Sequence, residues 1–307
     1  MIALYALLGL LGLVVLANLI SGRLPKAPPA GGGMLAIEGG ELHYLEMVGE
    51  GTPIVFIHGM PGTCREFDRL RAMFPDRHTI AVDRPGYAWS TGEPLEFAKQ
   101  IDEVKSALER LGVERAVFVG HSFGGLFALG AAIRHPQLVA SMLLIAPAAG
   151  GTRMGEQRIK QARLVRRLQK PGIRQVCDLL FLRLVRREAT RRGALIAYGD
   201  DHDLTAQRDI AESVLSRHNS IAALMNDRLI FNDAERLVTK GLRRVAAPAI
   251  VVHGSEDQTV PPQRGRRVAE ALGCEFALIE GGDHQLPTKN TEAVSSALSA
   301  ACRLAAP

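Results

Sequence analysis

Hydrophobic and polar positions alternate along the chain in blocks that predict an α/β fold. Short apolar runs, typical of strands buried on both faces, fall in residues 53–59, 78–86, 116–122, 138–147, 247–254 and 274–281. Helix patterns cover residues 65–74, 96–112, 123–135, 262–273 and about 290–303, and residues 34–48 have the pattern of a hairpin. This alternation predicts a mostly parallel central sheet with helices on both faces.

The alternation stops between residues 148 and 245, where helix patterns dominate and no convincing apolar strand is found. We therefore expect one sheet domain made of residues 34–147 and 246–307, interrupted by a helical insertion over residues 148–245. Residues 23–33 are rich in Pro and Gly, which predicts a linker ahead of the sheet domain.

The N-terminal stretch has a hydrophobic pattern of a different kind. Residues 2–20 contain no charged side chain, and as a helix they would run roughly 28 Å, close to the hydrocarbon thickness of a bilayer. We expect residues 1–22 to be a membrane anchor, with Arg23 and Lys26 favouring a cytoplasmic position for the following domain. The alternative is a signal peptide removed before Asn18, which would export the domain. The lack of a basic residue before the apolar run favours the anchor.

Composition excludes several classes of protein. With 47% hydrophobic and 22% charged residues, the chain is globular rather than disordered. Its four cysteines are far apart and form no CxxC pair, so neither a zinc site nor a disulfide framework is expected. No sequence feature indicates an oligomeric state.

Positive charge is concentrated in residues 153–192, which hold 13 Lys and Arg against three acids. Such a basic block is typical of a solvated helix face, an anionic membrane surface or a nucleic-acid site. The block contains a single aromatic residue, Phe181, and no nucleic-acid-binding motif accompanies it. We therefore do not expect a nucleic-acid partner.

The segment Gly120-His121-Ser122-Phe123-Gly124 fits the pattern G-x-S-x-G. It follows an apolar strand pattern and precedes a helix pattern, which is the setting in which this motif exposes a serine hydroxyl on a sharp turn. Ser122 is therefore the candidate nucleophile.

A serine nucleophile needs a base and an acid that orients the base. Asp257 and His284 each follow a strand pattern, so both are expected at the carboxyl edge of the sheet with Ser122. Glu256 and Asp283 are rival acids and His253 is a rival base, although its place at a strand end favours a packing role.

Acyl transfer also requires N–H donors for the oxyanion. The backbone N–H groups of Phe123, directly after Ser122, and of Met60, in the loop after residues 53–59, are the candidates. Four apolar residues within 220–231 are candidates for a substrate pocket: Leu224, Met225, Leu229 and Phe231.

The segments HGMPG (58–62), DRPGYAWS (83–90), GHSFGG (120–125), HGSEDQTVPP (253–262) and GGDHQLP (281–287) resemble the α/β-hydrolase superfamily. The resemblance implies a Ser/Asp/His hydrolase with a helical cap and no metal or organic cofactor. It carries the catalytic roles onto Ser122, Asp257 and His284, and the oxyanion roles onto Met60 and Phe123. A serine at the turn argues against the similar haloalkane dehalogenases and epoxide hydrolases, which have an aspartate there.

One position departs from the pattern of the superfamily. Ala88 stands where many relatives have glycine, which affects the expected shape of that loop rather than the triad. Its neighbours Asp83, Arg84 and Trp89 are candidates for contact with the cap or substrate, but a structural turn is the favoured role.

The function predicted on this basis is hydrolysis of carboxylic esters with a small or lipid-like, apolar acyl part. Cleavage of carbon–carbon, amide or lactone bonds and perhydrolysis use the same triad and stay open. A non-catalytic binding protein on the same fold is a further alternative.

Overall fold

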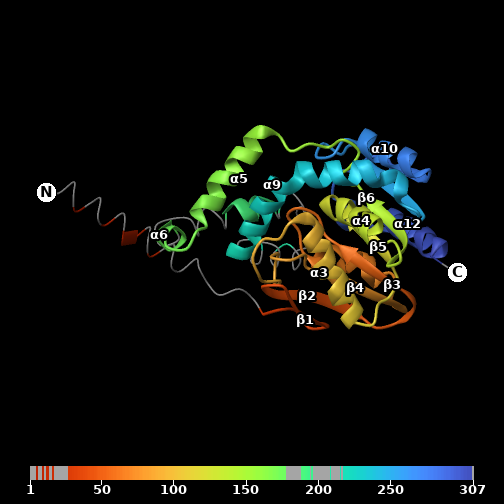
Figure 1. Cartoon of the computed structure of the whole chain (residues 1–307), viewed down its shortest axis with the longest axis horizontal. Helices are drawn as coiled ribbons and strands as arrows, with labels where there is room; N and C mark the ends of the chain where they lie inside the picture. The colour runs from red at the N-terminus through yellow and green to blue at the C-terminus, as the bar shows by residue number, and fades with distance from the viewer. Residues whose placement is uncertain are drawn as a thin grey trace.

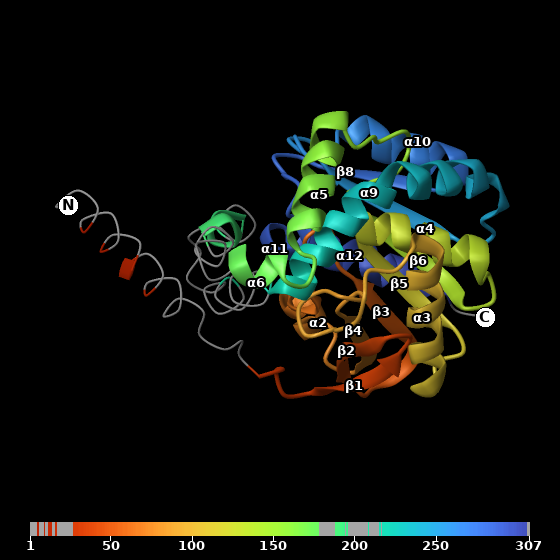
Figure 2. The same cartoon turned by 60° about the vertical axis from the view of Figure 1, so that its left-hand side comes forward.

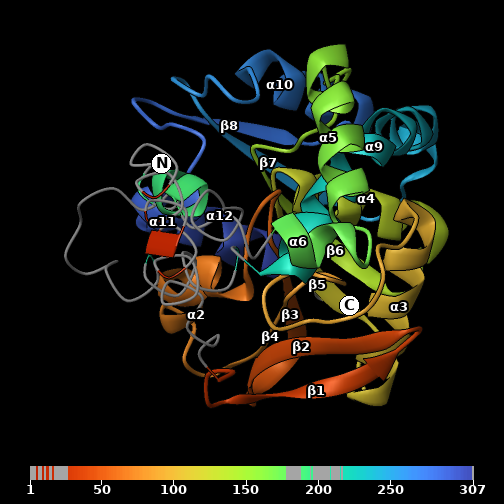
Figure 3. The ribbon, with the colours of Figure 1, turned by 90° about the vertical axis from the view of Figure 1, so that its left-hand side faces the viewer.

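The structure is a computed structural model that describes residues 27–177, 188–193 and 217–305, together with a few isolated residues. It contains a sheet of eight strands in the order β1-β2-β4-β3-β5-β6-β7-β8. The strands are β1 (Gly32–Ile37), β2 (Gly40–Met47), β3 (Glu50–Ile57), β4 (Arg77–Val82), β5 (Ala116–His121), β6 (Val139–Ile145), β7 (Ala249–Gly254) and β8 (Glu275–Ile279). Figure 3 shows β1 and β8 at opposite ends of this sheet.

The sheet is mostly parallel, as the sequence predicted. The β1–β2 and β2–β4 pairs are antiparallel, and β3 to β8 pair in parallel. Every residue of β5, β6 and β7 is buried, which explains their unbroken apolar patterns. Because side chains alternate across a strand, Phe118 of β5 joins the core on one face, while Val117 and Val119 join the core on the other.

Helices cover both faces of the sheet (Figures 1 and 2). Helices α3 (Phe97–Arg110), α4 (Phe123–Arg134) and α10 (Pro262–Leu272) contribute to one core. Helices α2 (Asp68–Ala72) and α12 (Thr291–Leu304) contribute to the other. The helix predicted for residues 65–74 is instead a 3-10 turn, η1 (Cys64–Phe67), followed by the short α2, and α11 (Leu286–Lys289) precedes α12.

Between β6 and β7, the described part of the chain contains helices and no strand. These include α5 (Glu156–Leu168), α6 (Ile173–Cys177), α9 (His218–Gly241) and the 3-10 turn η4 (Leu242–Arg244), and residues 188–193 are helical as well. Helices α5 and α9 lie side by side (Figure 2). Helix α9 also packs on α4, where the rings of Phe231 and Phe123 are 6.0 Å apart. The insertion is thus fixed to the core through α9.

Among the described residues, no helix is long and apolar enough to span a bilayer. The anchor expected over residues 1–22 lies largely outside the described residues, and so does much of the insertion between residues 178 and 216.

Candidate active site

Ser122 lies on the sharp turn between β5 and α4. Its φ of 53° and ψ of −116° fall in a region that L residues rarely adopt. The flanking glycines are required by close backbone contacts: a Cβ on Gly120 would lie 2.2 Å from Gly124 O, and one on Gly124 would lie 2.0 Å from Ile57 O. The motif therefore fixes a strained turn whose geometry excludes larger side chains on either side.

The three residues predicted as a triad form one hydrogen-bonded chain. His284 Nε2 is 3.0 Å from Ser122 Oγ, and His284 Nδ1 is 2.6 Å from Asp257 Oδ2. All three are buried, with 5–9% of their surface exposed. Asp257 follows β7 and His284 follows β8, so loops at neighbouring strand ends bring together residues far apart in sequence.

The electrostatics keep Asp257 ionised and His284 neutral. Burial disfavours the Asp257 carboxylate, but hydrogen bonds from His253 and His284 and from the Val260 N–H outweigh it and hold its pKa well below the usual range. Burial lowers the pKa of His284, an effect that Asp257 opposes and the nearby His121 reinforces. A neutral imidazole beside a hydroxyl is suited to accept a proton.

The rival residues occupy other positions. Glu256 is exposed, and Asp283 forms an ion pair with Lys289 at 2.7 Å. His253 is buried, with its Nε2 2.8 Å from Val260 O and 3.2 Å from Asp257 Oδ2. His253 thus supports the acid, a role that its sequence position did not reveal.

The loop that carries Met60 is held against the serine. A Cβ on Gly59 would lie 3.2 Å from Ser122 Cβ, and Met60 lines the cavity above the triad. Phe123 is the first residue of α4, so its N–H has no acceptor within the helix. Both N–H groups named from the sequence therefore belong to segments next to Ser122.

A cavity of about 370 Å³ opens over the triad. Its lining combines core segments with α9 and with other residues of the insertion. It comprises Gly59, Met60, Pro61, Gly62, Glu66, His121, Ser122, Ala189, Thr190, Gly193, Leu215, Ser220, Ile221, Leu224, Arg228, Thr259, His284 and Gln285. Of the four apolar candidates, Leu224 lines this cavity. Met225 and Phe231 are buried, 5% and 3% exposed, and Phe231 belongs to the core, while Leu229 is half-buried outside this lining.

Two polar residues of the lining were not anticipated from the sequence. His121 Nδ1 lies 2.5 Å from Glu66 Oε1, and His121 Nε2 donates to the backbone carbonyl of His284 at 2.8 Å. Burial opposes a charge on His121, yet Glu66 raises the pKa of this histidine above its ordinary value. Both ring nitrogens of His121 face oxygen acceptors and its pKa is raised, so Glu66 favours the positive form of this imidazole, whose ring lies 4.9 Å from that of His284.

A buried ion pair joins α9 to the loop that carries Met60. Arg84 Nη2 lies 2.7 Å from Asp227 Oδ2 of α9 and also donates to Gly59 O at 3.0 Å. Tyr87 and Gln100 also donate to the Asp227 carboxylate. Since Gly59 O and Met60 N belong to one peptide, the contact that holds this carbonyl also fixes the direction of the Met60 N–H. Arg84 thus does contact the insertion.

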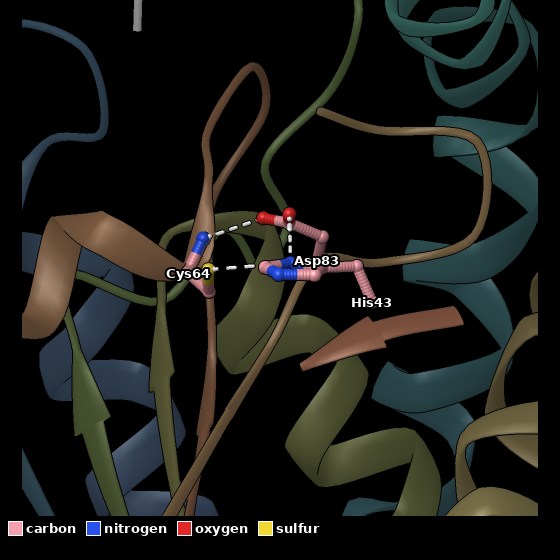
Figure 4. A group of neighbouring side chains, drawn as sticks. All are labelled: His43, Cys64 and Asp83. Atoms are coloured by element: carbon pink, nitrogen blue, oxygen red, sulfur yellow. Dashed lines mark hydrogen bonds and ion pairs between the residues drawn. The ribbon is translucent and has the colours of Figure 1, made fainter. Parts of the chain in front are cut away.

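Asp83 is fully buried, and its carboxylate lies between His43 and Cys64 (Figure 4). Its carboxylate accepts from His43 Nδ1 at 2.8 Å and from the Cys64 N–H at 2.7 Å. His43, Cys64 and Asp83 are the one group of three metal-ligating side chains found close together among the described residues. Burial raises the pKa of the Cys64 thiol well above its usual range, which disfavours the thiolate that a metal would need. These contacts are those of a structural turn.

A family model described as "Alpha/beta hydrolase family" matches residues 54–297. The chain belongs to this family. It is therefore a hydrolase. A pimeloyl-[acyl-carrier protein] methyl ester esterase of Xylella fastidiosa is 28% identical over 78% of this chain and 91% of its own length.

Solved structures agree on the fold. A thermophilic esterase from Thermogutta terrifontis superposes with a TM-score of 0.70 at 19% identity, over 89% of this chain and 99% of its own. An enol-lactonase from Burkholderia xenovorans superposes with a TM-score of 0.69 at 19% identity, over 87% and 98% of the two chains. At these identities the likeness shows the fold and leaves the substrate open.

Proposed function

We propose that this hydrolase cleaves carboxylic esters, small or lipid-like, through an acyl-enzyme on Ser122. The observation that carries the proposal is the chain of contacts from Ser122 Oγ through His284 to Asp257, at 3.0 and 2.6 Å, beneath a cavity of about 370 Å³. The esterase names of similar proteins give independent support.

In the proposed acylation step, Ser122 Oγ attacks the ester carbonyl carbon while His284 Nε2 accepts the hydroxyl proton. Asp257 stabilises the resulting imidazolium and holds its orientation. The carbonyl oxygen becomes an oxyanion that the N–H groups of Met60 and Phe123 stabilise. The intermediate collapses when the C–O bond to the alcohol breaks and His284 gives its proton to the departing oxygen.

Deacylation repeats these steps with water. His284 accepts a proton from a water molecule that attacks the acyl carbon, and the same N–H groups stabilise the second oxyanion. His284 then returns the proton to Ser122 as the acid is released. His284 thus carries every proton transferred in these steps, and Asp257 stays ionised throughout.

The test is fluorophosphonate labelling followed by a panel of methyl and p-nitrophenyl esters of increasing acyl length. We expect one covalent label that abolishes ester turnover. Lactones, amides and peracid formation from acetate and peroxide belong in the same panel, because they use the same triad. If the protein is labelled but hydrolyses amides or lactones far faster than every ester, the ester assignment is refuted. The proposed catalytic role of the triad would still stand.

We also propose that residues 2–20 anchor the hydrolase to a membrane, with the catalytic domain on the cytoplasmic side. The absence of charge in this segment supports the proposal.

Membrane fractions should be washed with high salt and then with carbonate, and the N-terminus read by mass spectrometry. An inserted helix resists both washes, whereas attraction of the basic block to anionic lipid is screened by salt. Release by salt alone, or a mature chain that begins at Asn18, would contradict the anchor.

A further inference from the structure

Arg228 lines the cavity that holds Ser122 and has no hydrogen-bond or ion-pair partner among the residues that the structure describes. Among the described lining residues, the side chains with a formal charge at neutral pH, besides histidine, are Glu66 and Arg228. Glu66 is bound to His121, whereas Arg228 forms no ion pair or hydrogen bond with any described residue. Its guanidinium is therefore available to a ligand.

The surroundings of Arg228 disfavour a charge without a partner. Burial lowers the pKa of Arg228 and the like charge of Arg158 on α5 lowers it further, while Tyr87 opposes both by a smaller amount. Its neighbour Asp227 is fully engaged with Arg84, Tyr87 and Gln100. A half-buried guanidinium keeps its charge at neutral pH, so a bound anion would relieve its incomplete solvation.

The register of α9 directs Arg228 toward the site. Ser220, Ile221, Leu224 and Arg228 follow one another at spacings of one, three and four residues, and all four line the cavity. Residues three or four apart lie on one helix face. This face therefore presents two apolar side chains followed by one cation, a pattern suited to a short apolar chain that ends in an anion.

The basic block adds a long-range effect of the same sign. Helix α5, side by side with α9 in Figures 1 and 2, has five Lys and Arg against one Glu. A surface of one sign concentrates ligands of the opposite charge near a site. The excess of positive charge in residues 153–192 therefore favours an anionic substrate over a cationic one.

We propose that the site selects esters that carry an anionic group, a carboxylate or a phosphate, and that Arg228 binds this group. The inference rests on the proposed ester hydrolysis and specifies its substrate class. A carboxylate or phosphate matches the planar guanidinium with two parallel hydrogen bonds. Apolar atoms between the anion and the ester would lie against Ile221 and Leu224.

The test compares esters that differ only in charge. On the acyl side, the full-length protein is assayed with monomethyl adipate and with methyl adipamate, in which a neutral amide replaces the carboxylate. On the alcohol side, 4-acetoxybutanoate is compared with 4-acetoxybutanamide, and 2-acetoxyethyl phosphate tests a phosphate. We expect kcat/KM to favour the anionic ester of at least one pair by about 10- to 100-fold, the range of a charged hydrogen bond.

Arg228→Gln should reduce the ratio of anionic to neutral kcat/KM toward one, whereas Arg228→Lys should keep part of it. Arg236→Gln is the matched control, because Arg236 lies on the same helix with 65% of its side chain exposed. The control should keep the wild-type ratio. The inference would be overturned if the anionic and neutral esters of every pair had equal kcat/KM. It would also be overturned if Arg228→Gln kept the wild-type ratio of anionic to neutral kcat/KM.

A binding measurement separates this inference from the proposed function. Adipate should bind the wild-type protein in calorimetry and bind Arg228→Gln at least tenfold more weakly. If the protein hydrolyses no ester but binds adipate through Arg228, ester hydrolysis fails and the anion site stands. If esters are cleaved but Arg228→Gln binds adipate as tightly as the wild-type protein, the anion site fails and ester hydrolysis stands.

Discussion

The core half and the insertion half of the cavity are built differently. On the core side, Ser122, Asp257 and His284 are at most 9% exposed and bonded to one another. On the insertion side, Leu224 and Arg228 of α9 are half-buried, and Arg228 has no described partner. The core side is thus held in place by hydrogen bonds between its own residues, whereas the described residues give Arg228 on the α9 side no such partner.

One buried ion pair links the two halves. Arg84, from the loop after β4, bonds both Asp227 of α9 and the carbonyl of Gly59. Burial opposes the charge on Arg84, but Asp227 raises its pKa above the ordinary value. The difference between the halves shows that neighbouring residues on one helix have different surroundings: Asp227 is bonded to the core, and Arg228, the next residue, lines the cavity.

The largest effect is expected when Asp257, the proposed acid of the core half, is replaced. Asp257→Asn should reduce kcat by about 10⁴-fold, because the amide no longer favours the His284 tautomer that accepts the Ser122 proton. Glu256→Gln, at the exposed neighbouring carboxylate, is the matched control and should leave kcat near the wild-type value. The comparison is made by steady-state kinetics on one ester; the reverse outcome would transfer the role of the acid to Glu256.

Breaking the link between the halves should cost stability. Asp227→Asn leaves Arg84 buried without a counter-ion, so the free energy of unfolding should fall by about 3–5 kcal/mol. Asp233→Asn, in an exposed pair with Arg236 on the same helix, should have no measurable effect. Urea unfolding measures both variants. Equal stability of the two would mean that Arg84 finds another partner.

Much of the core half could be predicted from the sequence. Ser122, Asp257 and His284 each follow an apolar strand pattern, and the parallel sheet brings such positions to one edge. The α9 half could not be predicted in the same way. Apolar character predicts a place in the pocket for Met225 and Phe231, but both side chains are buried outside its lining, whereas the charged Arg228 lines it.

The buried polar pairs could not be predicted from the sequence either. Asp227 is stabilised by Arg84, which lies 143 residues away, and Glu66 by His121, which lies 55 residues away. Each charge alone has the pattern of an exposed residue, and only the fold brings the partners together.

Ala88 stands where many relatives have glycine, and its φ of 48° lies in the left-handed region, which glycine adopts without steric cost.

A smaller effect is expected in the pH dependence. Activity requires neutral His284, so the rate should fall as the pH drops through the pKa of this residue. Since the positive charge on His121 lowers that pKa, His121→Gln should move the acidic limb of kcat/KM toward higher pH, by up to about one unit. A shift toward lower pH would contradict the charge assigned to His121.

The smallest effect is expected from a chelator. None of the proposed steps uses a metal, so exhaustive treatment with EDTA should leave kcat/KM unchanged within error. If activity were lost and then restored by zinc, the cluster of His43, Cys64 and Asp83 would be the first site to examine, through Asp83→Asn.

The central claim is covalent catalysis by Ser122, and trapping the acyl-enzyme tests it most directly. The protein is mixed with a p-nitrophenyl ester, quenched with acid within milliseconds and measured by intact mass spectrometry with peptide mapping. We expect a mass increase of one acyl group on the peptide that contains Ser122, and none in Ser122→Ala, whose turnover should fall by about 10⁴-fold or more with the fold intact. An acyl group on another residue, or near-normal turnover by folded Ser122→Ala, would contradict the account.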